Sequence, residues 1–276
     1  MYHESFIILF HFYHAAQLFG SNTAVWTKTN VVDSGILLDG LTSAHVLSFS
    51  VLDDDAVSTL GTYVYSYNAE HLVASFLDTN SITDVSTINA ATLGNMGNLV
   101  CGFNSTQMAS LDSTAVDDAS NDLASVTCLT SEQLIALANK IVEVRGTDWT
   151  SVTSSSVSSL GVLAGGLPVS VLEDLGSDQI ASITTAAIAA IDPTTFATVF
   201  TVEKISYMSS AQANSVTVDQ QAQLSSDQLD ALMAVATTTT AGDGSDNGST
   251  RLALATPTVV LATLVSLLLA TNTRNA

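Results

Sequence analysis

The side chains that most often transfer protons or bind metals are gathered in the first quarter of this sequence. The five histidines are His3, His11, His14, His45 and His71. Acid–base and nucleophilic catalysis require such groups within hydrogen-bond reach of one another. The sequence has no nucleophile elbow, phosphate-binding loop or metal-binding helix motif to supply them. We therefore expect no enzyme, no catalytic residue, no cofactor and no small-molecule substrate.

Two of the histidines fall within the predicted fold. His45 and His71 each occupy the third position of a predicted helix, where glutamine stands in other helices of this chain. A polar side chain at this position can bond back to the start of its own helix. We expect both histidines to take part in helix capping.

Two acidic clusters could attract a cation, Asp53-Asp54-Asp55 and the segment from Asp243 to Asp246. Carboxylates are ligands that calcium prefers, but neither cluster has the ligand spacing of a calcium loop. Two cysteines cannot hold zinc by themselves, and no histidine follows His71 to help them. We expect no metal site.

The two cysteines, Cys101 and Cys128, are compatible with an extracellular disulfide. Closing that loop would stabilise the fold by roughly 3 to 4 kcal/mol on the chain-entropy model. Two triplets have the acceptor sequence for N-glycosylation, beginning at Asn104 and at Asn247. Asn104 is also expected to cap a helix, so that a glycan there would compete with capping.

The C-terminal part of the chain has the pattern of a glycosylphosphatidylinositol (GPI) anchor signal. Asn247-Gly248-Ser249 supply small residues, Thr250 to Thr258 a spacer, and Val259 to Ala270 a hydrophobic tail. Asn247 is the predicted attachment residue, and Gly244 and Ser245 are the alternatives.

The rival interpretation takes Leu252 to Ala270 as a transmembrane helix, which needs about 20 apolar residues. Pro257, three threonines and Ser266 weaken such a span, and only one arginine follows it, where a basic cytoplasmic flank is usual. The lipid anchor is favoured. Either interpretation places the body of the protein outside the cell.

The N-terminus allows two interpretations. Phe6 to Phe19 could be the apolar core of a signal peptide that ends near Gly20-Ser21. However, the first five residues carry no lysine or arginine, and His11 and His14 interrupt the run. A gene model that begins inside a longer precursor would look the same.

Helix-start signals dominate the remainder. In LTSEQLIAL, Thr130 can cap the backbone N–H of Gln133 while the Gln133 side chain reaches back to the N–H of Thr130. Leu129 and Leu134 flank this capping box and can pack on each other as a hydrophobic staple. The stretch therefore predicts a helix with a locally encoded entry.

The same pattern returns in LGSDQIASI, FTVEKISYM, LSSDQLDAL and FNSTQMASL, with weaker copies ITTAAIAAI, IDPTTFATV and MSSAQANSV. From residue 175 onward a unit begins every eight or nine residues, and the best-formed caps come every third unit, at 175, 200 and 224. Helices shorter than about 12 residues are marginal alone, so these units must stack on one another. The sequence predicts an all-α fold, a superhelical, armadillo-like solenoid of short stacked helices.

Composition supports a folded chain and limits its partners. Hydrophobic residues make up 47%, mean hydropathy is +0.38, and 26 acidic residues face 6 basic ones, for a net charge of −20. Such a charge repels phosphate backbones, so nucleic acid is not expected as a partner. Trp149 is expected in the core, with an exposed binding hot spot as the alternative.

The predicted segments are a possible signal peptide at 1–20, a helical-repeat ectodomain at 21–236, a Ser/Thr/Gly-rich linker with the anchor site at 237–250, and a hydrophobic C-terminal signal, removed on maturation, at 251–276.

The repeat units, together with the cysteines in LVCGF and TCLTSEQL and the anchor signal, resemble the mesothelin, stereocilin and otoancorin family. The units that carry the resemblance are LTSEQLIALANKIVEV, SSLGVLAGGLPVSVLEDLGSDQIASI and AAIAAIDPTTFATVFTVEKISYM. The step from Leu160-Gly161 to Gly166-Leu167 is similar to that family's repeat junction, and Leu60-Gly61 and Leu93-Gly94 look like earlier copies. The resemblance covers about residues 90 to 250 well and 40 to 90 loosely.

The resemblance implies a helical array held on the outer cell surface by a lipid and used for attachment. It supplies no catalytic residues. The sequence thus predicts a GPI-anchored adhesion protein in the outer leaflet of the plasma membrane, which binds extracellular matrix or a mucin-like glycoprotein. Two alternatives remain: a ligand-binding surface receptor or decoy module with a single transmembrane span, and a shed structural component of an extracellular gel.

Overall fold

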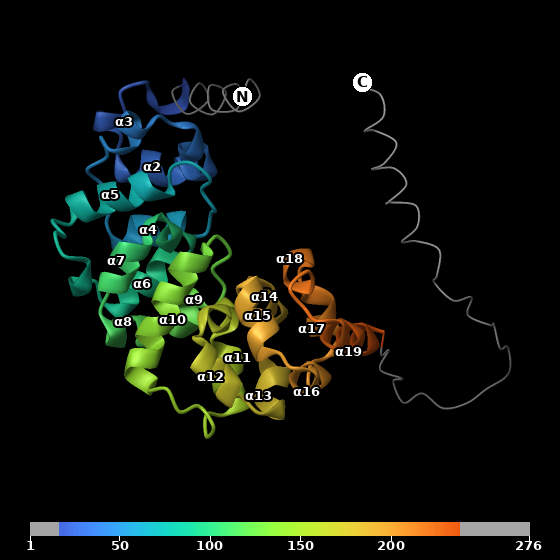
Figure 1. The fold of residues 1–276 in the computed structure, drawn as a ribbon. Coiled ribbons are helices and arrows are strands. Elements are labelled where there is room, and N and C mark those ends of the chain that lie inside the picture. The colour runs from blue at the N-terminus through green and yellow to red at the C-terminus, as the bar shows by residue number, and fades with distance from the viewer. Residues whose placement is uncertain (1–16, 238–276) are drawn as a thin grey trace, which may run out of the picture. The chain divides into compact units, whose positions relative to one another are not determined.

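The computed structural model describes residues 17–237. Most of the predicted signal peptide, nearly all of the linker, the hydrophobic tail and the candidate attachment residues Asn247, Gly244 and Ser245 lie outside the described residues. The described part contains helices and no strand, so the all-α prediction is confirmed (Figure 1). None of its helices is long and apolar enough to cross a membrane.

The helices are short and follow one another closely. The first group is α2 (Lys28–Ser34), α3 (Ser43–Val46), α4 (Asp54–Leu60), α5 (Ala69–Thr79), α6 (Ala90–Met96), α7 (Ser105–Ser110), α8 (Ser113–Asp118), α9 (Ser120–Leu123) and α10 (Ser131–Arg145). The second group is α11 (Ser154–Ser159), α12 (Val169–Asp174), α13 (Ser177–Ser182), α14 (Thr185–Ala190), α15 (Pro193–Val199), α16 (Val202–Ser206), α17 (Ser210–Ser215), α18 (Val218–Gln221) and α19 (Ser226–Ala236). The 3-10 helices are η1 (Thr23–Val25), η2 (Gly35–Gly40), η3 (Val85–Thr87), η4 (Gly97–Gly102) and η5 (Gly161–Gly166).

Local caps set where these helices begin, as the sequence predicted. Thr130 accepts a hydrogen bond from the N–H of Gln133, and its own N–H donates to Gln133 Oε1 at 2.8 Å. Reciprocal capping boxes also start α2, α7, α17, α18 and α19. At α13 the N-cap is Gly176, which has no side chain to accept a bond, so only the Gln179 half of the box forms.

From α12 onward, most helices three places apart in the chain pack on each other. The pairs are α12 with α15, α14 with α17, α15 with α18 and α16 with α19 (Figure 1). Paired helices start 24 or 25 residues apart, which is the spacing of the best-formed caps in the sequence. This stacking is what the predicted solenoid requires, and the armadillo-like superhelix as a whole stays a prediction.

Three 3-10 helices recur at a wider spacing along the chain, and they are called corners below. η2, η4 and η5 are each six residues long, and their first glycines, Gly35, Gly97 and Gly161, have φ of 48°, 49° and 52°. The closer counterparts of the Gly161–Gly166 junction are therefore η2 and η4, and not the Leu60-Gly61 and Leu93-Gly94 steps proposed from the sequence.

The corner at η4 shows why glycine is needed. A Cβ on Gly97 would lie 2.6 Å from the carbonyl oxygen of Gly61, and the N–H of the next residue, Asn98, donates to that oxygen at 2.8 Å. Gly61 thus supports the corner from α4, although it is not a corner itself. The buried apolar side chains form one continuous core from Trp26 to Leu232.

Candidate functional site

A side-chain amide at the third position of a helix joins that helix to an earlier layer of the fold. Five glutamines share this arrangement and are called the glutamine ladder: Gln133, Gln179, Gln212, Gln220 and Gln228. Each directs Nε2 to two backbone carbonyl oxygens about 30 residues earlier, while its Oε1 accepts the N–H of the N-cap.

Gln212 illustrates the geometry. Its Nε2 lies 2.8 Å from the oxygen of Ile180 and 2.6 Å from that of Ile183, and its Oε1 lies 2.7 Å from the nitrogen of Ser209. One amide therefore caps the start of its own helix and the end of α13, four helices earlier. Since free helix ends must find hydrogen-bond partners, Gln212 satisfies groups at two helix ends with one side chain.

The sequence interpretation treated these glutamines as local caps and missed their long-range bonds. A signal was present, because a capping box accepts either glutamate or glutamine, whereas only an amide can also donate. In α16 a lysine takes this position, and Lys204 Nζ donates to the oxygens of Leu172 at 2.7 Å and Glu173 at 2.8 Å. Burial lowers the pKa of Lys204 below its usual value.

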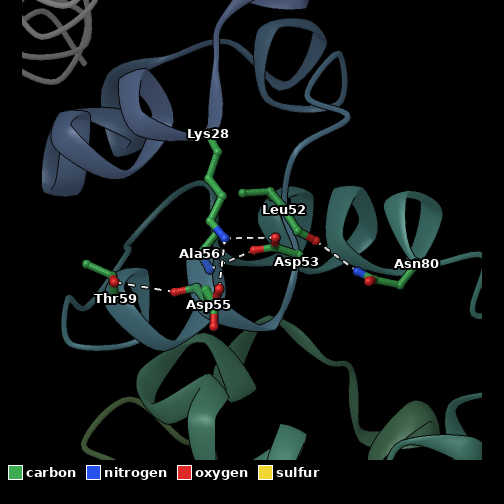
Figure 2. A network of polar contacts seen from close by, with 7 residues as sticks. All are labelled: Lys28, Leu52, Asp53, Asp55, Ala56, Thr59 and Asn80. Carbon is green, nitrogen blue, oxygen red and sulfur yellow. Dashed lines mark hydrogen bonds and ion pairs between the residues drawn. The ribbon is translucent and has the colours of Figure 1, made fainter.

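The acidic cluster at the start of α4 holds a lysine. Lys28 Nζ lies 2.8 Å from Asp53 Oδ2 and 3.1 Å from Asp55 Oδ2, and Asp53 Oδ1 accepts the N–H of Ala56 as the N-cap (Figure 2). The hydrogen bond from Lys28 holds the pKa of Asp53 below its usual value. Within residues 17–237, no group of three or more acidic, histidine or cysteine side chains could hold a metal ion.

The two histidines in the fold differ in role. His45 Nδ1 lies 2.9 Å from Oγ1 of its N-cap, Thr42, so the capping prediction for His45 is confirmed. The prediction for His71 is wrong, because its Nδ1 is buried without a hydrogen-bond partner. The N-cap of α5, Asn68, sends Nδ2 to the carbonyl oxygens of Leu38 and Leu41 instead of capping its own helix.

The cysteines are brought together as predicted. Cys101 in η4 and Cys128 before α10 form a disulfide with their Cα atoms 5.9 Å apart. Trp149 is fully buried and its Nε1 donates to the oxygen of Gly146 at 2.9 Å. It is therefore a core residue, and the alternative of an exposed hot spot is wrong.

The first glycosylation sequence lies close to the disulfide. Asn104 is exposed and caps α7, with Oδ1 accepting the N–H of Gln107 at 2.8 Å. An N-linked glycan is attached to Nδ2, which takes no part in the cap. Capping and glycosylation thus use different atoms, and the expected competition is not required. The second sequence, at Asn247, lies outside the described residues.

The described surface is acidic with almost no free positive charge. Residues 17–237 contain 23 acidic side chains and four basic ones. Each basic side chain is engaged: Lys28 by Asp53 and Asp55, Lys140 by Glu143, Arg145 by Asp117, and Lys204 by backbone oxygens. A partner that binds through charge must therefore be cationic.

Comparison with known proteins gives the relationship of the chain. No family model matches it. Human stereocilin is 30% identical over 217 residues, which are 78% of this chain, and mouse stereocilin is 30% identical over 218 residues. The chain is a relative of stereocilin. A human protein described as putative stereocilin-like protein is 31% identical over 203 residues, which are 72% of the chain.

The resemblance to the mesothelin, stereocilin and otoancorin family is thereby confirmed. The part of this chain that matches covers only 12% of human stereocilin, 11% of the stereocilin-like protein and 12% of mouse stereocilin. The relationship covers most of this chain, and it concerns a small part of those proteins. In this stereocilin relative the disulfide and the family relationship together fit an extracellular chain.

Proposed function

We propose that this stereocilin relative is a cell-surface adhesion protein, held in the outer leaflet of the plasma membrane by a GPI anchor. Its partner is extracellular matrix or a mucin-like glycoprotein. The observation that carries the proposal is the similarity to stereocilin over 78% of the chain. The disulfide between Cys101 and Cys128 supports an extracellular location, because disulfides persist in oxidising compartments.

The arrangement of the described residues supports binding rather than catalysis. The glutamine ladder and Lys204 donate to backbone oxygens of the fold itself, and Lys28 and Arg145 pair with carboxylates of the same chain. The protein acts through its surface in this proposal, without a cofactor or a small-molecule substrate.

The anchor is tested on intact cells. The full chain carries an epitope tag after residue 21 and is expressed in animal cells, which are then treated with phosphatidylinositol-specific phospholipase C. Release of the tagged protein into the medium supports the lipid anchor. Leu268→Arg is the matched control, because a charge in the hydrophobic tail should prevent anchor attachment. Surface protein that resists the enzyme would favour the transmembrane receptor instead.

Adhesion is tested on the same cells. Cells that express the full chain should attach to wells coated with mucin or basement-membrane extract, and treatment with the phospholipase should abolish the gain. Equal attachment by expressing and non-expressing cells would contradict the adhesive role. Recovery of the tagged protein mainly in insoluble matrix would favour the gel component.

A further inference from the structure

A groove runs between α10 and the segment that contains α14 and the start of α15. Three adjoining cavities of about 320, 220 and 270 Å³ form it, and Ala190 lines all three. Leu134 of α10 lines the first and third, and Asp192 lines the second and third. The shared lining residues show that the three cavities adjoin one another.

The groove stays open because its floor and one wall lack large side chains. α10 and α14 both pack on η5. A Cβ on Gly166 would lie 2.4 Å from the oxygen of Leu134 in α10, and a Cβ on Gly165 would lie 2.7 Å from the oxygen of Ala187 in α14. Neither glycine can carry a side chain without displacing a helix, and α14 presents the exposed Ala186 and Ala189 to the groove.

One cavity of the groove offers an apolar contact. Ile135 of α10 is 44% exposed and Val169 of α12 is 36% exposed, and both line the cavity of about 220 Å³ together with Pro168. Ser131 and Asn139 line the same cavity, and their side chains make no hydrogen bond within the described structure. The site can therefore hold an apolar side chain and bond a backbone beside it.

The charge of the groove selects its occupant. Asp192 and Asp219 are the charged side chains that line it, and no basic residue does. Asp192 uses Oδ1 to cap α15, and the side chain of the exposed Asp219 has no hydrogen bond or ion pair with another described residue. The four basic side chains of the described region are engaged elsewhere, so within residues 17–237 no basic side chain pairs with the two carboxylates.

We propose that this groove binds an extended peptide segment of a partner protein. Small or apolar side chains of the segment lie over the glycine floor, an apolar one contacts Ile135 and Val169, and lysine or arginine pairs with Asp192 and Asp219. The proposal goes beyond adhesion, because a groove of this kind would serve a surface-bound and a released protein alike.

The test is a selection with purified full-length chain. A phage library of random nine-residue peptides is panned on it, and the enriched peptides are then synthesised with a fluorescent label. We expect peptides that combine lysine or arginine with small apolar residues, and binding that weakens as salt is raised. Ala189→Arg should weaken binding at least tenfold, because it places a long, cationic side chain in the groove.

A matched pair of variants tests the charge. Asp219 and Asp227 are both exposed and both stand at the second position of a helix, in α18 and α19, and only Asp219 lines the groove. Asp219→Lys should weaken the peptides at least fivefold, and Asp227→Lys should leave them unchanged. Circular dichroism verifies that each variant is folded.

Three outcomes would overturn the proposal. The first is a selection that yields no peptide above background. The second is a set of acidic peptides, or binding that Ala189→Arg does not weaken. The third is a purified chain that is dimeric and that Ala189→Arg converts to a monomer, which would make a second copy the occupant.

Discussion

Replacing the amide of Gln220 by a carboxylate should destabilise the fold strongly, although only one heavy atom changes. Gln220 is fully buried, and its Nε2 donates to the carbonyl oxygens of Ile188 and Ile191, each at 2.8 Å. Gln220→Glu keeps a side-chain oxygen that can accept the backbone N–H of the N-cap residue, Thr217. It loses both donors and points a negative charge at two carbonyl oxygens.

The magnitude follows from the two acceptors. A buried acceptor left without its donor costs about 1 to 3 kcal/mol. The oxygen of Ile191 loses its Gln220 donor, and that of Ile188 keeps only a long contact of 3.4 Å from the backbone N–H of Ile191. The free energy of unfolding should therefore fall by about 2 to 5 kcal/mol. Because burial beside two carbonyl oxygens disfavours the charged form, the introduced carboxyl should have a raised pKa. The cost should therefore shrink as the pH falls through that value, since the protonated acid can donate one bond.

The assay is urea unfolding followed by circular dichroism, at neutral and at mildly acidic pH. Gln107→Glu is the matched control, because Gln107 stands in a capping box and makes no bond to an earlier layer. Its glutamate keeps that box, so the expected change is within about 0.5 kcal/mol. Similar losses for Gln220→Glu and Gln107→Glu would refute the role assigned to the glutamine ladder.

Three further predictions concern the disulfide, a glycine at a corner and a glycosylation sequence, and urea unfolding measures the stability in each. Replacing Cys101 and Cys128 by serine should lower the free energy of unfolding by roughly 3 to 4 kcal/mol, and an unchanged urea midpoint would contradict a structural disulfide. Gly97→Ala should lower the free energy of unfolding by about 2 kcal/mol or more, because the added Cβ would meet a backbone oxygen at 2.6 Å and φ is unfavourable. Gly146→Ala has open space around the new Cβ and should lower it by only about 1 kcal/mol. Equal losses would show that the close approach at Gly97 does not matter. Asn104→Asp should remove the glycan, seen as faster migration on a gel, and keep the helix cap. Asn104→Ala should lose both the glycan and the cap, and the lost cap should lower the free energy of unfolding by about 1 kcal/mol. If glycosidase does not change the gel migration of the unaltered chain, Asn104 is not glycosylated.

Local features were well predicted from the sequence. Thr130 and Ser225 cap helices where the pattern placed them, and the eight-residue rhythm matches the succession of helices from α13 to α19. The pairing of the cysteines followed from their number alone. The caps depend on bonds between residues three or four positions apart, and two cysteines can pair with each other in only one way. Both features can therefore be inferred from the sequence.

The features that were not predicted from the sequence involve residues that are far apart in the chain. His71 was expected to cap α5, but Asn68 is drawn to carbonyl oxygens about 30 residues earlier, and no local pattern shows that. The corners at Gly35 and Gly97 were also missed, because glycine is required there by a positive φ and by a distant group that approaches it, the Tyr63 side chain at Gly35 and the backbone of Gly61 at Gly97. The groove beside α14 depends on the way α10 and α14 both meet η5.

The sequence by itself determined that this chain is a series of short capped helices, acidic, with one pair of cysteines. Helix caps, apolar spacing and net charge are properties of neighbouring residues or of composition. Only the tertiary structure decided which carbonyl oxygens the glutamine ladder reaches, and that a groove with carboxylates remains open between α10 and α14. Those outcomes depend on residues far apart in the chain meeting in space, and the stacking of the layers decides which residues meet.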